Sequence, residues 1–328
     1  MPSERQLSVW TAIGLWATAV AGAALYGAWH GHSGRAYVAT LSILAFFLAI
    51  QILFAAGNLG ERMARRTGRH IGVLLATVPF LAYVVYLAGA FSFTWARAAL
   101  AAAYTLAPIL LATSATTRNA GVWQDYVAML LIFLPLKMRL LNSFWPYGDT
   151  MVATVATMLL AISVALGTFL FVRQFDGLGY NIVWGRDAMS AVLWHFGILA
   201  LLLIPLGVAL HFIRFDPAQF HWKSMPGDAA FIFLLTAWPE EFLFRGLLQN
   251  SLSRTFSSET GGWIAASVVF GVAHITNNGV FPNWRYALLA TIAGIFYGRT
   301  WRKTNSIFAS AMVHALVDTV WHVAFRTL

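Results

Sequence analysis

Two adjacent glutamates, Glu240 and Glu241, lie in a strongly apolar stretch, and Arg245 follows four residues after the second. On an α-helix Glu241 and Arg245 share one face, while Glu240 is turned about 100° away from them. The arginine can therefore neutralise one carboxylate while the other stays available. Two carboxylates in an apolar environment need more compensation than one arginine supplies, so the pair indicates a functional site.

Two further motifs occur later in the chain. His274 follows Phe270 by four residues, and His314 precedes Asp318 by four, so each pair lies on one helical face. Counted along the expected spans, Glu240 and His274 lie about 16 Å deep, His314 about 12 Å and Asp318 about 18 Å, in a membrane core about 30 Å thick. We therefore expect the four side chains to meet near the midplane.

The composition indicates an integral membrane protein. The 328 residues are 59% hydrophobic and 10% charged, with a mean hydropathy of +0.70. The net charge of +9 comes from Lys and Arg scattered through short connections, which is typical of topology signals and does not favour a nucleic-acid partner. The absence of cysteine excludes disulfides, thiolate metal sites and a cysteine nucleophile.

The hydropathy pattern predicts an all-α, polytopic transmembrane helical bundle of about eleven spans. Basic connections at 62–69 and 299–303 are both expected in the cytoplasm, with the N-terminus inside. The fifth span is short, and it is counted as crossing because the two basic connections otherwise fall on opposite sides. The spans are expected at 7–29, 36–57, 71–92, 97–113, 122–136, 150–172, 188–212, 229–250, 262–277, 284–300 and 306–325.

Polar residues are distributed unequally between the two halves of the chain. The first six spans carry few internal ionisable groups, and the motifs collect after about residue 188. We therefore expect an accessory N-terminal transmembrane bundle over 1–187 and a catalytic bundle over 188–328.

Several ionisable residues have ordinary explanations. His195 and His211 are better interpreted as packed or interfacial, and His322 as interfacial next to Trp321. Arg245 taken alone could equally be a helix-end arginine that reaches toward the headgroups.

The three motifs together resemble those of the CPBP family of intramembrane glutamic endopeptidases, which includes CAAX prenyl proteases and Abi-type bacterial relatives. The pattern E-E-x-x-x-R is met by Glu240, Glu241 and Arg245. F-x-x-x-H is met by Phe270 and His274, and H-x-x-x-N/D by His314 and Asp318. The resemblance covers roughly 188–328.

This resemblance implies that Glu240 and His274 activate a water that attacks a peptide carbonyl, and that His314 and Asp318 stabilise the oxyanion. Glu241 and Arg245 would support the site, and no cofactor is implied. The residue types are consistent with this role for Glu240, because removal from water makes a glutamate a stronger base. Asp318 departs from the Asn of prenyl-processing members. It would be protonated, or would orient His314 instead.

The implied partners are the lipid bilayer and a membrane-anchored or lipidated protein, cleaved near its C-terminus. We expect a multi-pass protein of the bacterial inner (cell) membrane. Pro239, which has no N–H, is predicted to kink the helix just before Glu240 and make polar room for a water.

Three alternatives stay open. Glu240, His274, His314 and Asp318 could instead form a mixed zinc site, although the sequence has no H-E-x-x-H. The same buried residues could serve a proton- or ion-coupled transporter, for which related halves would be expected and are not evident. A non-catalytic membrane binding or immunity protein is the third. The sequence lacks G-x-S-x-G and G-x-G-D, the patterns of serine and aspartate intramembrane proteases.

Overall fold

The computed structural model describes residues 5–147 and 150–328 and is almost entirely helical, which confirms the all-α prediction. Helix covers most of each of the eleven predicted spans, although the predicted spans at 122–136, 229–250, 262–277 and 284–300 do not coincide with a described helix that is both long and apolar enough to cross a membrane. Seven helices in the described part of the chain are long and apolar enough to cross a membrane. These seven are Val9–Trp29, Gly34–Arg66, His70–Gly89, Trp95–Thr113, Met151–Val172, Arg186–Ala209 and Ile307–Ala324.

The chain divides into two compact units, 7–176 and 177–328, and the latter includes residues 1–6. The boundary precedes the predicted one at 187/188 because residues 177–185 pack against the helices that follow. Asn181 donates its side-chain N–H to the carbonyl of Asn305, and the N–H of Ile307 donates to the carbonyl of Gly179. The accessory role of the first half stays a prediction.

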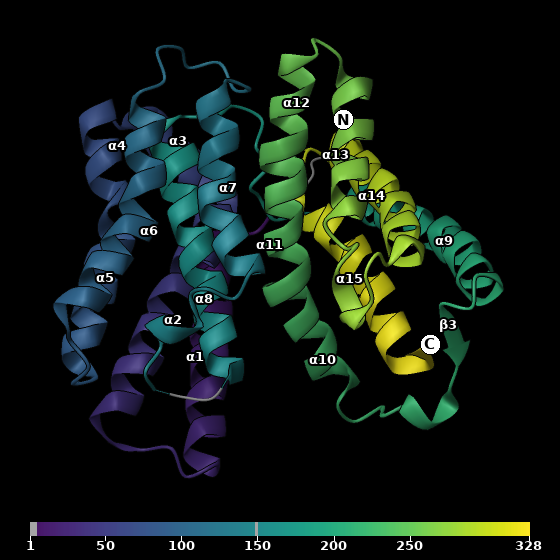
Figure 1. Ribbon diagram of the computed structural model, residues 1–328, viewed down its shortest axis with the longest axis horizontal. Coiled ribbons are helices and arrows are strands. Elements are labelled where there is room, and N and C mark those ends of the chain that lie inside the picture. Colours follow the sequence, from purple (N-terminus) through teal and green to yellow (C-terminus); the bar gives the residue numbers. More distant parts are fainter. Residues whose placement is uncertain (1–4, 148–149) are drawn as a thin grey trace. The chain divides into compact units, whose positions relative to one another are not determined.

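The unit 7–176 is a helical bundle (Figure 1). Its helices α2 and α8 pack against each other, as do α6 and α7. The elements are α1 (Val9–Trp29), α2 (Gly34–Ala55), η1 (Ala56–Asn58), α3 (Leu59–Arg66), α4 (Arg69–Ala76), α5 (Val78–Gly89), α6 (Trp95–Thr113), α7 (Trp123–Lys137), η2 (Asn142–Phe144), α8 (Thr150–Ala165) and the π-helical η3 (Leu166–Val172).

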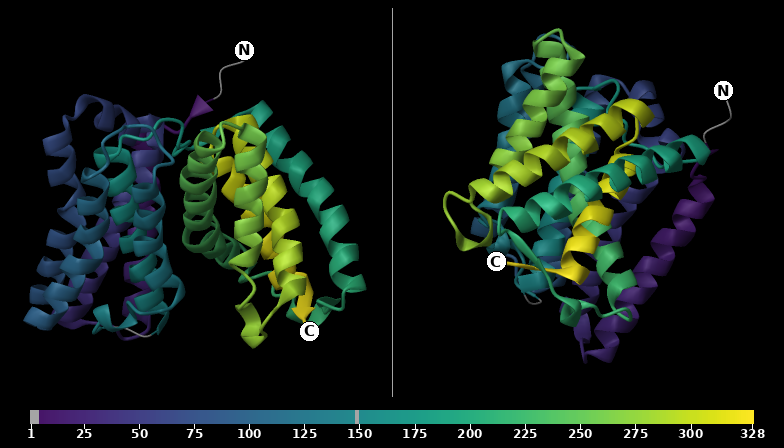
Figure 2. Two further views of the ribbon diagram at one scale, coloured as in Figure 1. Left: turned by 45° about the horizontal axis from the view of Figure 1, so that its top comes forward. Right: turned by 90° about the vertical axis from the view of Figure 1, so that its right-hand side faces the viewer.

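In the unit 177–328, α9 runs along α14 and α15 (Figure 2). Helices α10, α11 and α12 form one continuous column with the π-helical η5 and η6 between them (Figure 1). The elements are β2 (Val183–Trp184), α9 (Arg186–Ala209), β3 (Ile213–Phe215), η4 (Pro217–Gln219), α10 (Met225–Ile232), η5 (Phe233–Ala237), α11 (Trp238–Glu241), η6 (Phe242–Gln249), α12 (Asn250–Thr255), α13 (Glu259–Val272), η7 (Asn277–Gly279), α14 (Trp284–Thr304), α15 (Ile307–Ala324) and β4 (Phe325–Thr327).

Two short antiparallel strand pairs belong to this unit. β1 (Arg5–Gln6) pairs with β2, and β3 pairs with β4. The second pair ties the end of α9 to the end of α15. Ile213 of β3 belongs to a small apolar cluster with Phe212 and Leu289, and Phe325 of β4 packs against it.

A buried ion pair stabilises the unit 7–176. Arg173 Nε lies 2.6 Å from Asp125 Oδ1, and Arg173 Nη2 lies 3.2 Å from Oδ2. The arginine also donates to the carbonyls of Thr117 and Asn119, while Asp125 Oδ2 accepts the N–H of Gly121. The pair therefore ties the α6–α7 connection to the end of η3.

We expect Asp125→Ala to lower the free energy of unfolding by about 3–5 kcal/mol, because it leaves the buried Arg173 without its counter-charge. Thermal unfolding of the purified protein in detergent measures this. Asp187→Ala is the control, since Asp187 is exposed on α9. Equal melting temperatures for the two variants would contradict a stabilising role for the pair.

Candidate functional site

The two glutamates lie in a short α-helical segment between two π-helical ones. η5 ends at Ala237, α11 spans Trp238–Glu241, and η6 begins at Phe242. Pro239, which cannot donate a backbone hydrogen bond, is the second residue of α11, just after the widened turns of η5. Segments of this kind are frequent at functional sites, because they rotate the following side chains relative to a regular helix.

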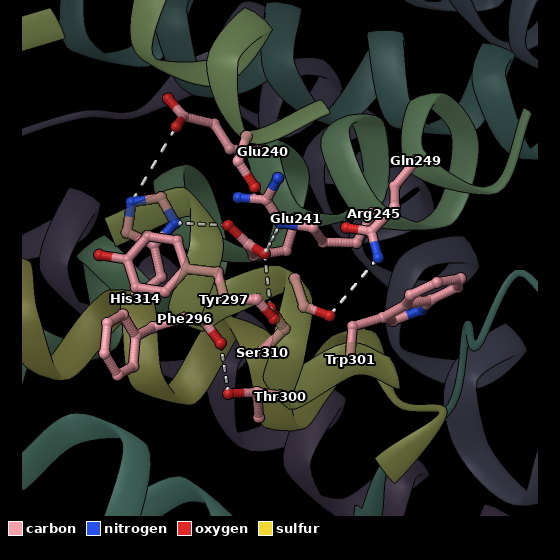
Figure 3. Close-up of polar contacts among 12 residues, drawn as sticks. Glu240, Glu241, Arg245, Gln249, Phe296, Tyr297, Thr300, Trp301, Ser310 and His314 are labelled. Carbon is pink, nitrogen blue, oxygen red and sulfur yellow. Dashed lines mark hydrogen bonds and ion pairs between the residues drawn. The ribbon is translucent and has the colours of Figure 1, made fainter. Parts of the chain in front are cut away.

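Glu241 is fully buried and binds donors from two helices (Figure 3). Its Oε2 accepts from Arg245 Nε at 2.9 Å and from Ser310 Oγ at 2.5 Å. Its Oε1 lies 3.0 Å from His314 Nδ1. Because an ionised carboxylate only accepts hydrogen bonds, Nδ1 of His314 carries the hydrogen. Glu241 therefore fixes both the position and the tautomer of this histidine.

Arg245 is also fully buried, so it does not reach toward headgroups as a helix-end arginine would. Besides its ion pair with Glu241, its guanidinium lies 5.0 Å from the ring centre of Phe270 and 5.9 Å from that of Tyr297. Cation–π attraction of this kind is strongest where water is excluded. Glu241, Arg245 and the two rings therefore form a compensated charged group in the interior.

Glu240 points away from this group toward a cavity (Figure 3). Its Oε2 lies 4.0 Å from Nε2 of His274 and also 4.0 Å from Nε2 of His314. Within the described residues this oxygen has no hydrogen-bond partner. The separation exceeds a direct hydrogen bond but allows all three groups to contact one small molecule between them.

The two histidines are held by different acceptors. His274 Nδ1 donates to the carbonyl of Phe270 at 2.7 Å, which leaves its Nε2 facing Glu240. His314 stacks on Tyr297, with ring centres 4.6 Å apart and planes 14° apart. Asp318 Oδ2 lies 3.4 Å from His314 Nε2. Both imidazoles thus present Nε2 to the same space.

A cavity of about 230 Å³ contains this space. Six of its lining residues have charged or non-aromatic polar side chains or are histidines: Thr236, Glu240, His274, Asn277, His314 and Asp318. Tyr286, Tyr297 and Trp321 add aromatic side chains with one polar atom each, and the rest of the lining is apolar. A mainly apolar pocket with a few convergent polar groups is typical of a ligand or substrate site.

The other histidines that the sequence sets apart do not line this cavity. His195 is buried and forms a hydrogen bond to the hydroxyl of Thr300 at 2.8 Å, as a packed histidine would. Ser310, which sequence reasoning missed, binds Glu241 from the face of α15 that carries His314 and Asp318. Its position four residues before His314 was the available signal.

Among residues 5–147 and 150–328, no group of three or more His, Cys, Asp or Glu side chains is arranged to hold a metal ion. The residues of the zinc alternative lie around the cavity, with Glu240 Oε2 4.0 Å from Nε2 of both His274 and His314.

Comparison with known proteins places these residues in a family. Residues 222–320 match the family model described as "Type II CAAX prenyl endopeptidase Rce1-like". A protein of Bacillus subtilis (strain 168), "Uncharacterized protein YpbD", is 28% identical over 107 residues, which cover 33% of this chain and 50% of that protein. The match thus spans half the length of this relative, and no solved structure matches the chain. The segment that carries all three motifs, residues 222–320, thus matches the CPBP/CAAX protease family, which supports the assignment that the motifs indicate.

Proposed function

We propose that this protein is an intramembrane or membrane-proximal endopeptidase in which Glu240 and His274 activate a water molecule. The observation that carries the proposal is the position of Glu240 Oε2, 4.0 Å from Nε2 of both His274 and His314 at the wall of an apolar cavity. The family description, an endopeptidase of CAAX type, supports the reaction class.

Glu240 is the proposed general base. Its side chain is partly exposed, and its Oε2 has no hydrogen-bond partner within the described residues, whereas the carboxylate of Glu241 is engaged by three donors. Glu240 is therefore the carboxylate that is available to accept a proton from a water. His274, whose Nδ1 hydrogen is engaged by the Phe270 carbonyl, offers Nε2 to the same water.

His314 and Asp318 are proposed to act on the substrate oxygen. When protonated, His314 presents an N–H at Nε2, because its Nδ1 hydrogen is directed to Glu241. Asp318, 3.4 Å from Nε2, stabilises the positive charge on this imidazole. The sequence leaves two roles open for Asp318, as a protonated group at the oxyanion or as a residue that orients His314. The short distance to His314 supports the second role. A preorganised donor at a developing oxyanion contributes about 3–4 kcal/mol in other hydrolases.

The proposed reaction has no covalent enzyme intermediate. Glu240 takes one proton from the water. At the same time the water oxygen forms a bond to the scissile carbonyl carbon, and the carbonyl oxygen becomes the oxyanion. The C–N bond then breaks, and the proton is delivered to the leaving amine. The products are a new C-terminal carboxylic acid and a new amine. Transfer of the acid proton to the amine gives the carboxylate and the ammonium group, so charge and atoms balance with water as the only co-reactant.

The proposed substrate is a membrane-anchored or lipidated protein, cleaved near its C-terminus. The cavity is lined mainly by aliphatic and aromatic side chains, which fits an apolar segment delivered from the bilayer. The substrate segment would place its scissile carbonyl between Glu240 and His314.

We expect Glu240→Gln and His274→Ala each to reduce cleavage at least about a hundredfold, the usual effect of losing general acid–base catalysis. The assay compares membrane proteomes of cells that express each variant, scoring new C-termini among membrane-anchored proteins. His195→Ala is the matched control, because His195 is a buried histidine outside the cavity.

Cleavage products that persist in Glu240→Gln at the wild-type level would refute the mechanism. No difference between wild type and the folded variant would instead favour a binding or transport protein, and ion uptake would then be measured. Thermal unfolding of each purified variant separates a loss of chemistry from a loss of the fold.

Metal chelation tests the zinc alternative. We expect cleavage by the purified protein to survive prolonged treatment with a chelator such as 1,10-phenanthroline, because the proposed water is activated by side chains alone. A loss of cleavage that added zinc restores would assign Glu240, His274, His314 and Asp318 to a metal site. Glu240→Gln without chelator gives the baseline for complete inactivation.

A further inference from the structure

Helix α3 in the unit 7–176 departs from the path of the membrane-spanning α2. The 22 residues of α2 extend about 33 Å, enough for a hydrocarbon core of about 30 Å. Gly57 and Asn58 then adopt left-handed conformations, with φ of 53° and 55°, and interrupt the helix. The eight residues of α3 therefore follow beyond the core, at the depth of the lipid headgroups.

α3 is amphipathic in a way that suits this depth. Leu59 and Met63 line an apolar cavity, while Arg62, Arg65 and Arg66 are exposed. A short helix with arginines on one side and apolar residues on the other is typical of the membrane interface. The arginines and the cavity wall thus belong to the same two turns of helix.

The cavity has a volume of about 330 Å³ and an almost purely apolar lining. The hydroxyl of Ser163 is its one polar side-chain group, and it donates to the carbonyl of Leu159. The lining comes from α2, α3, α4, α5, α8 and η3 and comprises Phe46, Ala49, Ile50, Leu53, Phe54, Leu59, Met63, Leu75, Val78, Pro79, Ser163, Gly167 and Phe171. Such a lining matches a hydrocarbon chain and offers nothing to a polar ligand.

α3 is held firmly beside this cavity. Gln174 Nε2 donates to the carbonyls of Ala64 and Thr67, both at 2.9 Å, which satisfies the end of the helix. At Gly60 the helix approaches η3 so closely that a Cβ atom would lie 2.8 Å from Leu170 Cδ2. The arginines therefore project from a fixed support.

The charge on α3 is only partly compensated. Arg65 Nη1 lies 3.4 Å from Glu61 Oε2, so this pair is close to neutral. Neither Arg62 nor Arg66 forms an ion pair with any residue of the described ranges. Two positive charges therefore remain at headgroup depth, next to an apolar chamber.

We propose that α3 and the adjacent cavity form a binding site for an anionic phospholipid. One acyl chain occupies the cavity, and the phosphate contacts Arg62 and Arg66. A single lipid carries both the hydrocarbon chain and the anion that the two halves of the site require. Arginine binds phosphate oxygens through charge-assisted hydrogen bonds, and a zwitterionic lipid gains less because its own cation opposes the arginines. This inference does not depend on the proposed protease activity.

Titration of the purified full-length protein in neutral detergent, followed by native mass spectrometry, tests the site. The probes are dioleoyl phosphatidylglycerol and dioleoyl phosphatidylcholine. We expect Arg62→Gln/Arg66→Gln to weaken phosphatidylglycerol binding about tenfold and to leave phosphatidylcholine unchanged. Ala49→Phe, which narrows the cavity, should weaken both lipids.

Arg299→Gln/Lys303→Gln is the matched control, because it removes two exposed positive charges from the other basic segment. Phosphatidylglycerol binding that is unchanged in the α3 variant, or equally weakened in the control, would overturn the proposal. Inorganic phosphate is added as a competitor of phosphatidylglycerol. If it displaces the lipid as effectively as a second lipid molecule does, in both wild type and Ala49→Phe, the site binds an anion but no acyl chain. That result would also overturn the proposal.

Discussion

The buried carboxylate of Glu241 is the group on which the arrangement of the site depends. It accepts hydrogen bonds from Arg245, on its own helix, and from Ser310 and His314 on α15. A carboxylate buried without such partners costs several kcal/mol, so its burial requires α15 to pack against the helix that carries the glutamates. The same contact sets the direction of His314 Nε2.

The two adjacent glutamates consequently have opposite environments. Glu241 is enclosed and fully compensated, whereas Glu240 faces an apolar cavity and is 4.0 Å from two imidazole nitrogens. Helical geometry produces this contrast, because adjacent residues point about 100° apart. A site that needs one structural and one reactive carboxylate can therefore take both from neighbouring positions in the chain.

The unit 7–176 lies outside the family match at 222–320. It nevertheless also pairs a buried carboxylate with a buried arginine. Its interior pair, Asp125 and Arg173, is bidentate and further engaged by backbone groups. Arg62 and Arg66, which form no ion pair within the described residues, are instead exposed. The fully buried carboxylates Asp125 and Glu241 thus each lie beside a buried arginine, as the cost of an isolated interior charge requires.

The sequence by itself determined the helical class and, to within several residues, where the expected helices lie. An apolar stretch of about 20 residues has to satisfy its backbone groups internally in a bilayer, and a helix is the form that does so. It also determined the ion pair of Glu241 with Arg245, because partners four residues apart meet on any helix. For the same reason, four-residue spacing placed His314 next to Asp318.

The depth of the motifs predicted that Glu240, His274, His314 and Asp318 would meet, but only the tertiary structure decided which atoms from different helices come into contact. The contacts of Glu241 with Ser310 and His314 join residues 69 and 73 positions apart, and local spacing carries no information about such pairs. The tertiary structure also decided that Arg245 is enclosed between aromatic rings and that residues 177–185 pack with the second unit. These outcomes follow from how the helices pack, which is a property of the whole bundle.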